Sequence, residues 1–271
     1  MAVALEVQGV SLRFGGVRAL TDVSFAVNKG ELFSIIGPNG AGKTSIVNCI
    51  SGRYTPTEGR LFYNGKNITG LKPNARASLG IGRTFQNLAL FHHMSVLDNI
   101  MVGRHHLLKN NFITGSLYWL GARREELEHR RKVEEIIDFL DLQSVRKAVA
   151  GTLPYGLRKR VELARAMALE PNLILLDEPM AGMNFEEKED MARYIVDLNE
   201  EFGMTVMMIE HDMGVVMDIS HRITVLDFGK KIAEGLPGDV LSDPHVKRAY
   251  LGEVDDVLTD PDDKKILEAS A

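Results

Sequence analysis

Residues 37–44 have the residue types and the spacing that bind phosphate groups. They read Gly37-Pro38-Asn39-Gly40-Ala41-Gly42-Lys43-Thr44, are followed by Ser45, and match the pattern G-x-x-x-x-G-K-[ST]. Glycine lets backbone N–H groups approach a phosphate closely, Lys43 adds a point charge for the β and γ phosphates, and the Thr44 hydroxyl can ligate Mg²⁺. A plain glycine-rich turn before a helix would not need Lys43 and Thr44 together. The stretch therefore predicts a nucleotide-binding phosphate loop.

A second group of chemically useful residues stands at the end of an apolar run. Residues 173–176 read Leu-Ile-Leu-Leu, and two carboxylates, Asp177 and Glu178, follow directly. Ligands of an open parallel sheet bind beyond the carboxyl ends of its strands, so both carboxylates would face the nucleotide. Asp177 suits the Mg²⁺ shell, usually through a water molecule, and Glu178 suits polarising the attacking water. Solvated acids after an ordinary strand are the alternative, which the phosphate loop makes the weaker one.

These residues need strands and helices to position them, and the hydrophobic pattern predicts such elements. Strands are expected at residues 4–14, 20–27, 32–36, 60–63, 173–176, 205–209 and 223–226. A helix is expected from Gly42 to Gly52, and a helical block spans residues 96–168. Strands that alternate with helices predict an α/β fold with a parallel sheet covered by helices, into which the helical block is inserted.

The composition is that of an ordinary globular protein and argues against several other classes. The 271 residues are 45% hydrophobic and 25% charged. The formal net charge of −5 resides in residues 253–271, so residues 1–252 are neutral overall, which is a poor footprint for nucleic acid. The single cysteine, Cys49, excludes a disulfide framework. No stretch approaches the ~18 apolar residues of a membrane span, and residues 1–10 do not read as a signal peptide.

The order of the motifs closely resembles the ATP-binding cassette (ABC) ATPases, from Leu5 to about Gly252. Residues 37–44 look like the Walker A loop of that family, and residues 173–178 look like its Walker B strand. The resemblance implies ATP and Mg²⁺ as cofactors. It also implies a P-loop NTPase (RecA-like) parallel-sheet core with an N-terminal antiparallel β subdomain and an inserted α-helical subdomain.

The same resemblance divides the chain into parts. The ABC ATPase domain would span residues 1–252, with residues 1–86 and 166–252 as the nucleotide-binding core. Residues 87–165 would form the helical subdomain, and residues 253–271 would be an acidic, disordered tail.

Three further residues match family motifs only because of their order and spacing. Thr84-Phe85-Gln86 resembles the Q-loop, in which Gln86 would touch the metal or the attacking water and sense the permease. Glu210-His211-Asp212 follows a strand, as the family's switch histidine does, so His211 would contact the γ-phosphate. Phe14 stands where an aromatic ring of the family stacks on adenine.

Two departures from the family pattern stand out. The signature, typically Leu-Ser-Gly-Gly-Gln, aligns with Leu153-Pro154-Tyr155-Gly156-Leu157 and lacks the serine hydroxyl that would meet the partner subunit's γ-phosphate. A helix still begins there and the N–H of Gly156 can donate, so anion binding would be weakened rather than lost. Asn184 replaces the D-loop aspartate, which keeps the hydrogen bonding without the charge.

These departures resemble one of the two ATP-binding subunits of branched-chain amino acid importers. The matching segments are Tyr155-Gly156, Ala181-Gly182-Met183-Asn184, Arg83-Thr84-Phe85-Gln86 and Ala249-Tyr250-Leu251-Gly252. The resemblance implies a peripheral subunit on the cytoplasmic face of the inner membrane. Its implied partners are a second ABC ATPase subunit that is a paralogue, two transmembrane permease subunits and an extracytoplasmic solute-binding protein that acts through the permease. Nucleic acid is not an expected partner.

Other classes of the same superfamily are the alternatives. A DNA-repair or chromosome ATPase would carry a long coiled-coil insertion, for which the interval between Thr44 and Leu153 is too short. A translation-associated ATPase would carry two cassettes on one chain, and a module that only binds ATP would lack Glu178 or His211. The basic run Arg158-Lys159-Arg160 favours a local role toward phosphate or a partner subunit over nucleic acid.

Overall fold

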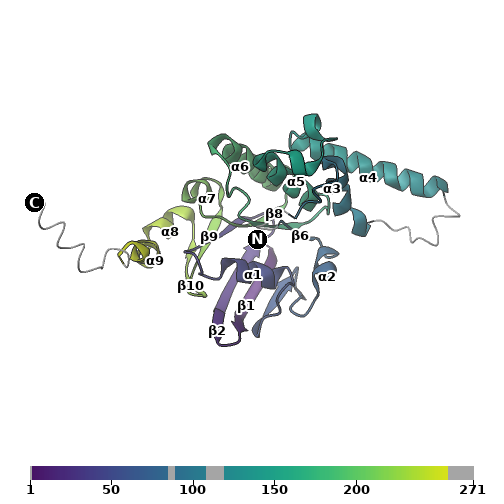
Figure 1. Ribbon diagram of the computed structural model, residues 1–271. Helices are drawn as coiled ribbons and strands as arrows, with labels where there is room; N and C mark the ends of the chain where they lie inside the picture. The colour runs from purple at the N-terminus through teal and green to yellow at the C-terminus, as the bar shows by residue number, and fades with distance from the viewer. Residues whose placement is uncertain (1, 85–88, 108–118, 256–271) are drawn as a thin grey trace, which may run out of the picture.

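The computed structural model describes residues 2–84, 89–107 and 119–255, which form two sheets flanked by helices (Figure 1). The first sheet is antiparallel, with strand order β2-β1-β4-β5. Its strands are β1 Val3–Phe14, β2 Val17–Asn28, β4 Glu58–Tyr63 and β5 Lys66–Asn67. The β1–β2 hairpin closes at the pair Phe14 and Val17, around the two glycines that predict a turn.

The second sheet has six strands in the order β10-β9-β3-β8-β7-β6, and only the edge strand β10 runs antiparallel to its neighbour. The strands are β3 Leu32–Ile36, β6 Ile81–Arg83, β7 Leu173–Asp177, β8 Thr205–Ile209, β9 Arg222–Asp227 and β10 Lys230–Gly235. This is the parallel-sheet core that the sequence predicts, with the antiparallel subdomain preceding it.

Helices fill the connections between these strands. They are α1 Lys43–Ile50, α2 Pro73–Ala77, α3 Val96–Gly103, α4 Trp119–Phe139, α5 Tyr155–Met167, α6 Phe185–Glu200, α7 Met213–Ile219, α8 Pro237–Ser242 and α9 Pro244–Asp255, with 3₁₀ turns at His105–Leu107, Gln143–Val145 and Ala150–Thr152. The helices α3, α4 and α5 form the predicted helical block between β6 and β7.

Alternate residues of the central strands face two different cores. Phe33 and Ile35 of β3 pack with the first sheet and α1, whereas Leu32 and Ile36 pack with the helices on the opposite face. Figure 1 shows α6 and α7 on one side of the six-stranded sheet and the first sheet on the other. Because both faces are covered, the central strands are mostly apolar and appear in the sequence as nearly continuous hydrophobic runs.

Some elements go beyond the sequence prediction. The hydrophobic pattern does not predict β6, which is very short, or β10, which begins with Lys230 and Lys231 at a sheet edge. Helix α9 continues to Asp255, past the expected domain end at Gly252, and the rest of the acidic tail lies outside the described residues. Within the described part of the chain, no helix is both long and apolar enough to cross a membrane.

Candidate active site

Adjacent parallel strands end side by side and bring the predicted residues to one edge of the second sheet. Strands β3, β8 and β7 are neighbours. The phosphate loop follows β3, Asp177 and Glu178 stand at the end of β7, and His211 follows β8. The carboxyl ends of parallel strands share an edge, which is why segments so far apart in sequence meet there.

Neighbouring backbone approaches the phosphate loop so closely that two of its glycines are obligatory. A Cβ atom at Gly37, where φ is 147°, would lie 2.0 Å from the carbonyl oxygen of Leu226. A Cβ atom at Gly42, where φ is 98°, would lie 2.7 Å from the carbonyl oxygen of Ala19. Both φ values and both contacts exclude an L side chain, so the loop keeps its shape only with glycine.

The buried side chain of Lys43 lies across the loop. Its Nζ donates to the carbonyl oxygens of Gly37 at 2.6 Å and Pro38 at 2.9 Å. Helix α1 begins at Lys43, so Thr44 and Ser45 lie in its first turn, where backbone N–H groups have no intrahelical acceptor. An ammonium group and open N–H groups at a helix start together form an anion site that suits phosphate.

Asp177 is buried beside Arg83, the last residue of β6. The Arg83 Nη2 donates to Asp177 Oδ2 at 3.0 Å, and its Nη1 donates to Asn48 and Ser51. Burial raises the pKa of the Asp177 carboxyl, and the Arg83 charge opposes that rise. The other oxygen, Asp177 Oδ1, is buried and accepts no hydrogen bond from the described residues. A buried carboxylate oxygen without a protein donor fits the water shell of Mg²⁺.

Glu178 and His211 are in direct contact. Glu178 Oε1 lies 2.6 Å from His211 Nε2, and both side chains are reachable by water, with exposed fractions of 14% and 43%. Glu178 has a φ of 52°, which is unusual for a residue with a side chain. Its N–H donates to the Ile209 carbonyl oxygen at 2.9 Å, which ties this turn to β8. The contact unites the predicted base with the predicted phosphate-contacting histidine.

Glu210 has a positioning role that the sequence did not reveal. Its buried carboxylate accepts from the N–H of Met180 at 2.7 Å and from the N–H of His211 at 3.0 Å. Burial raises the pKa of Glu210, and the two N–H donors oppose that rise. The carboxylate thus joins the backbone at His211, after β8, to the backbone at Met180, after β7. Three polar residues, Glu210, His211 and Asp212, follow the strand, and the sequence does not indicate which of them is buried.

The structure describes only one of the two remaining predicted residues. Phe14 ends β1, is 47% exposed, and meets Tyr54 edge to face with ring centroids 5.1 Å apart. Its stacking on adenine stays a prediction. Gln86 lies outside the described residues, but Thr84 donates its N–H to the carbonyl oxygen of Leu175 at 2.9 Å, so the Q-loop begins at the same sheet edge.

The signature and the D-loop asparagine each begin a helix. Pro154 is the N-cap of α5 and provides no side-chain hydrogen bond to it. Asn184 caps α6: its Oδ1 accepts from the N–H of Glu187 at 2.9 Å, and the Glu187 carboxylate accepts from the N–H of Asn184 at 3.0 Å. Asn184 therefore has a local structural role that its alignment with the D-loop did not indicate. Helix α5 packs on the face of the sheet opposite α1.

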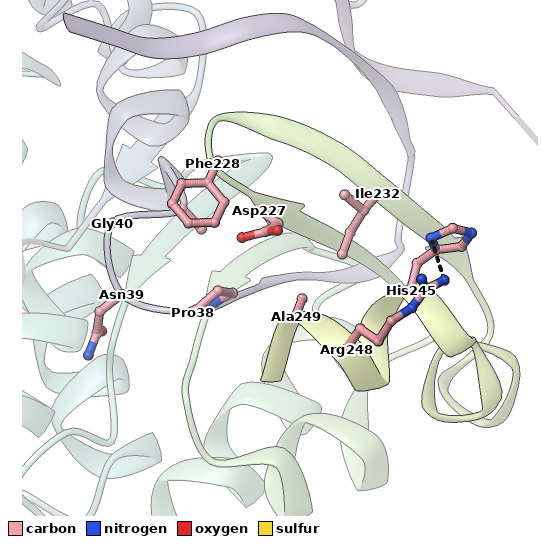
Figure 2. Close-up of a pocket in the computed structure, with 10 residues that line it drawn as sticks. Pro38, Asn39, Gly40, Asp227, Phe228, Ile232, His245, Arg248 and Ala249 are labelled. Atoms are coloured by element: carbon pink, nitrogen blue, oxygen red, sulfur yellow. Dashed lines mark hydrogen bonds between the residues drawn. The ribbon is translucent and has the colours of Figure 1, made fainter. Parts of the chain in front are cut away.

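A pocket of about 480 Å³ lies beside the phosphate loop (Figure 2). Its walls are the loop itself, the turn between β9 and β10 that carries Asp227 and Phe228, and helix α9 with Arg248. The N–H of Gly229 in this turn donates to the carbonyl oxygen of Ala41 at 3.0 Å. The C-terminal part of the described chain therefore abuts the phosphate loop directly.

Comparisons with known proteins give a consistent family. The ABC transporter family profile matches residues 20–181, and a profile described as branched-chain amino acid ATP-binding cassette transporter matches residues 230–256. The high-affinity branched-chain amino acid transport ATP-binding protein BraF of Pseudomonas aeruginosa is 41% identical, over 92% of this chain and 98% of that protein. LivG of Escherichia coli, which has the same description, is 38% identical over the same shares.

Solved structures give the same result for the fold. A crystal structure of the ADP conformation of MJ1267, an ATP-binding cassette of an ABC transporter, superposes with a TM-score of 0.81 at 34% identity. It covers 93% of this chain and 100% of that one. A nucleotide-free ATP-binding cassette from an ABC transporter superposes with a TM-score of 0.80, also at 34% identity, over 92% and 98% of the two chains. The chain belongs to the ABC transporter family, as one of its ATP-binding and ATP-hydrolysing cassettes.

Proposed function

We propose that this cassette powers an importer for branched-chain amino acids. The support is the match of residues 230–256 to a profile of that cassette type, together with relatives of that description along 92% of the chain. The matched segment contains β10 and α9. Ile232 of β10 and Arg248 of α9 line the pocket beside the phosphate loop, so the similarity extends to residues near the nucleotide site. No finding favours a DNA-repair or translation-associated role.

In this proposal the protein is a peripheral subunit at the cytoplasmic face of the inner membrane. It works with two transmembrane permease subunits and with an extracytoplasmic solute-binding protein that acts through the permease. Closure of two cassettes around ATP, followed by hydrolysis, drives the permease.

The contact of Glu178 with His211 is the observation that carries the hydrolytic mechanism. Glu178 accepts a proton from the attacking water, and His211 contacts the γ-phosphate. Thr44, Gln86 and, through water, Asp177 would hold Mg²⁺, which would supply positive charge against the phosphates.

The remaining groups bind the nucleotide. Lys43 and the backbone N–H groups of residues 39–45 hold the β and γ phosphates, and the ring of Phe14 stacks on adenine. The edge-to-face contact with Tyr54 steadies that ring while leaving it half exposed.

The second cassette is a paralogue with a fuller signature. In a homodimer, two copies of residues 153–157 would face two phosphate loops, and neither site would receive the serine hydroxyl. In a heterodimer, this chain's Lys43, Glu178 and His211 face a complete signature. The partner's phosphate loop then faces Pro154 and Tyr155, which makes the two ATP sites unequal.

The test is reconstitution in vesicles with a permease pair, the solute-binding protein and either this chain alone or this chain with a candidate paralogue. We expect uptake of labelled leucine and cooperative ATPase activity only with the paralogue present. A matched assembly carrying Glu178→Gln is the control for uptake that does not depend on hydrolysis. Full activity with this chain as the only cassette would refute the heterodimer, and absence of branched-chain uptake beside active hydrolysis would refute the solute.

A further inference from the structure

Helix α5 is joined to the end of β7 by a buried lysine. Lys159 is 3% exposed, and its Nζ donates to the backbone carbonyl oxygen of Glu178 at 3.1 Å. The sequence predicts a role toward phosphate or a partner subunit for the run that contains Lys159, but the structure turns this side chain inward. An ammonium group is costly to bury, so its position needs compensating contacts.

Those contacts are with the two carboxylate-bearing residues at the end of β7. One is the hydrogen bond to the main chain of Glu178. The other is electrostatic, because the Lys159 charge acts on the Asp177 carboxyl and opposes the rise in pKa that burial gives it. Lys159 therefore bears on both residues assigned to hydrolysis without being placed to touch the reacting atoms.

The Glu178 carbonyl is the point at which Lys159 can affect geometry. With a φ of 52°, Glu178 has a backbone conformation that residues with side chains rarely adopt. The carbonyl accepts from Lys159 at 3.1 Å and from the N–H of Ala181 at 3.3 Å. Loss of the ammonium donor leaves the longer of these two bonds, so the turn that orients the Glu178 side chain is held less firmly.

The first turn of α5 lies against the segment that follows Glu178. A Cβ atom at Gly182 would lie 3.1 Å from the ring of Tyr155, and a Cβ atom at Gly156 would lie 2.2 Å from Glu187 Oε1. Lys159 Nζ lies 5.9 Å from the centroid of the same Tyr155 ring. The signature residues and Lys159 thus contact one continuous segment, and they sit one helical turn apart on one helix.

We propose that Lys159 is a positioning residue that holds the Glu178 carboxylate in its working geometry and couples it to the signature at the start of α5. The inference rests on the proposed function, in which that signature faces the partner's nucleotide. When the partner's ATP engages the start of α5, the helix shifts, and Lys159 transmits the shift to the Glu178 carbonyl. Binding of ATP at one site therefore controls the orientation of the Glu178 carboxylate at the other site.

The test measures ATPase activity of the assembled transporter with Lys159→Met, which keeps the length and apolar stem of the side chain but removes the donor. We expect kcat to fall about 10- to 100-fold, as small displacements of a catalytic group do, with the KM for ATP within about twofold. The Hill coefficient should fall toward one. Lys159→Arg, which retains a donor and the charge, should restore kcat to within about threefold of the unmodified protein.

Two comparisons distinguish a positioning role of Lys159 from a nonspecific loss of activity caused by the substitution. Lys147→Met removes an exposed lysine of the helical region and should leave kcat within about twofold. Glu178→Gln should cost much less in the Lys159→Met background than in the unmodified protein, because the two changes disable the same group. Binding of a fluorescent ATP analogue verifies that each variant is folded. If Lys159→Met does not fold, Lys159→Gln replaces it, since its amide nitrogen stops one bond short of Nζ.

An unchanged kcat in a folded Lys159→Met variant, a matching loss in Lys159→Arg, or full additivity with Glu178→Gln would each overturn the inference. Those results leave the proposed function intact as long as Glu178→Gln alone abolishes hydrolysis. If Glu178→Gln alone retains hydrolysis, the assignment of the base itself is wrong.

Discussion

The phosphate loop and the segment that aligns with the signature both stand at the start of a helix, and both are assigned to a nucleotide in the proposed function, but their side chains differ. Neither α1 nor α5 has a side-chain hydrogen bond at its N-cap. The short helices α2 and α8 also lack one, whereas α3, α6 and α7 are capped by Ser95, Asn184 and Asp212. The two helices assigned to phosphate binding thus leave their first N–H groups open to a ligand.

The difference between the two starts is in their side chains. Helix α1 begins with Lys43, which is buried and held across the loop by two carbonyl oxygens. Helix α5 follows Pro154, which has neither a charge nor a hydroxyl, and begins with the partly exposed Tyr155. Under the proposed function, this chain therefore offers a charged, glycine-shaped loop to its own nucleotide and a helix start without charge or hydroxyl to its partner's.

The largest effect is expected from a change at the site where this chain would bind its own nucleotide. Glu178→Gln should keep ATP binding and lower single-turnover hydrolysis about 10²- to 10⁴-fold in the presence of the natural partner, because a general base contributes that much. The amide keeps the shape of the side chain and can still bond to His211, so folding should not change. A loss smaller than about threefold would remove Glu178 from the role of base.

The next largest effect concerns Lys43 at the start of α1, for which Pro154 and Tyr155 at the start of α5 provide no charged counterpart. Lys43→Ala should weaken binding of a fluorescent ATP analogue about 10- to 100-fold, since a hydrogen bond to a charged group contributes about 1.5–3 kcal/mol. The exposed Lys147→Ala is the matched control and should bind normally. Unchanged affinity for both ATP and ADP in Lys43→Ala would contradict the assignment of this lysine.

A third change adds to the start of α5 the hydroxyl group that its sequence lacks. Pro154→Ser gives α5 a hydroxyl at its N-cap and should raise the ATPase rate of the isolated chain by up to about tenfold at saturating ATP. Pro154→Ala, which removes the ring without adding a hydroxyl, should raise it by less than about twofold. Equal rates for both variants would show that the hydroxyl is not what limits this signature.

The smallest effect is expected from the acidic tail. Truncation after Asp256 retains α9 and the whole segment matched at residues 230–256, and it removes residues that contain no motif. Turnover should stay within about twofold and the melting temperature should not change measurably. A lower melting temperature or a lost dependence on the partner would assign the tail a structural or regulatory role.

Local pattern was sufficient to predict much of this fold. The strand at residues 32–36 is buried on both faces, so its hydrophobic run is readable without knowledge of its neighbours. The same holds for the loop after it, whose glycines, Lys43 and Thr44 are contiguous in the chain. The short strand β6 and the edge strand β10 lack such a run, because their residues are few or are partly exposed.

From the sequence alone, residue type and local spacing indicated the phosphate loop and the two carboxylates after a strand. The histidine after another strand was indicated only by its place in the order of the family's motifs. Tertiary structure alone decided how they are held, because the contacts join distant parts of the chain. Arg83 meets Asp177, Glu210 joins Met180 to His211, and Lys159 reaches Glu178. The sequence does not show whether a charged residue faces water or lies buried. Arg83, Glu210 and Lys159 point inward because α5, β6 and β8 pack around β7.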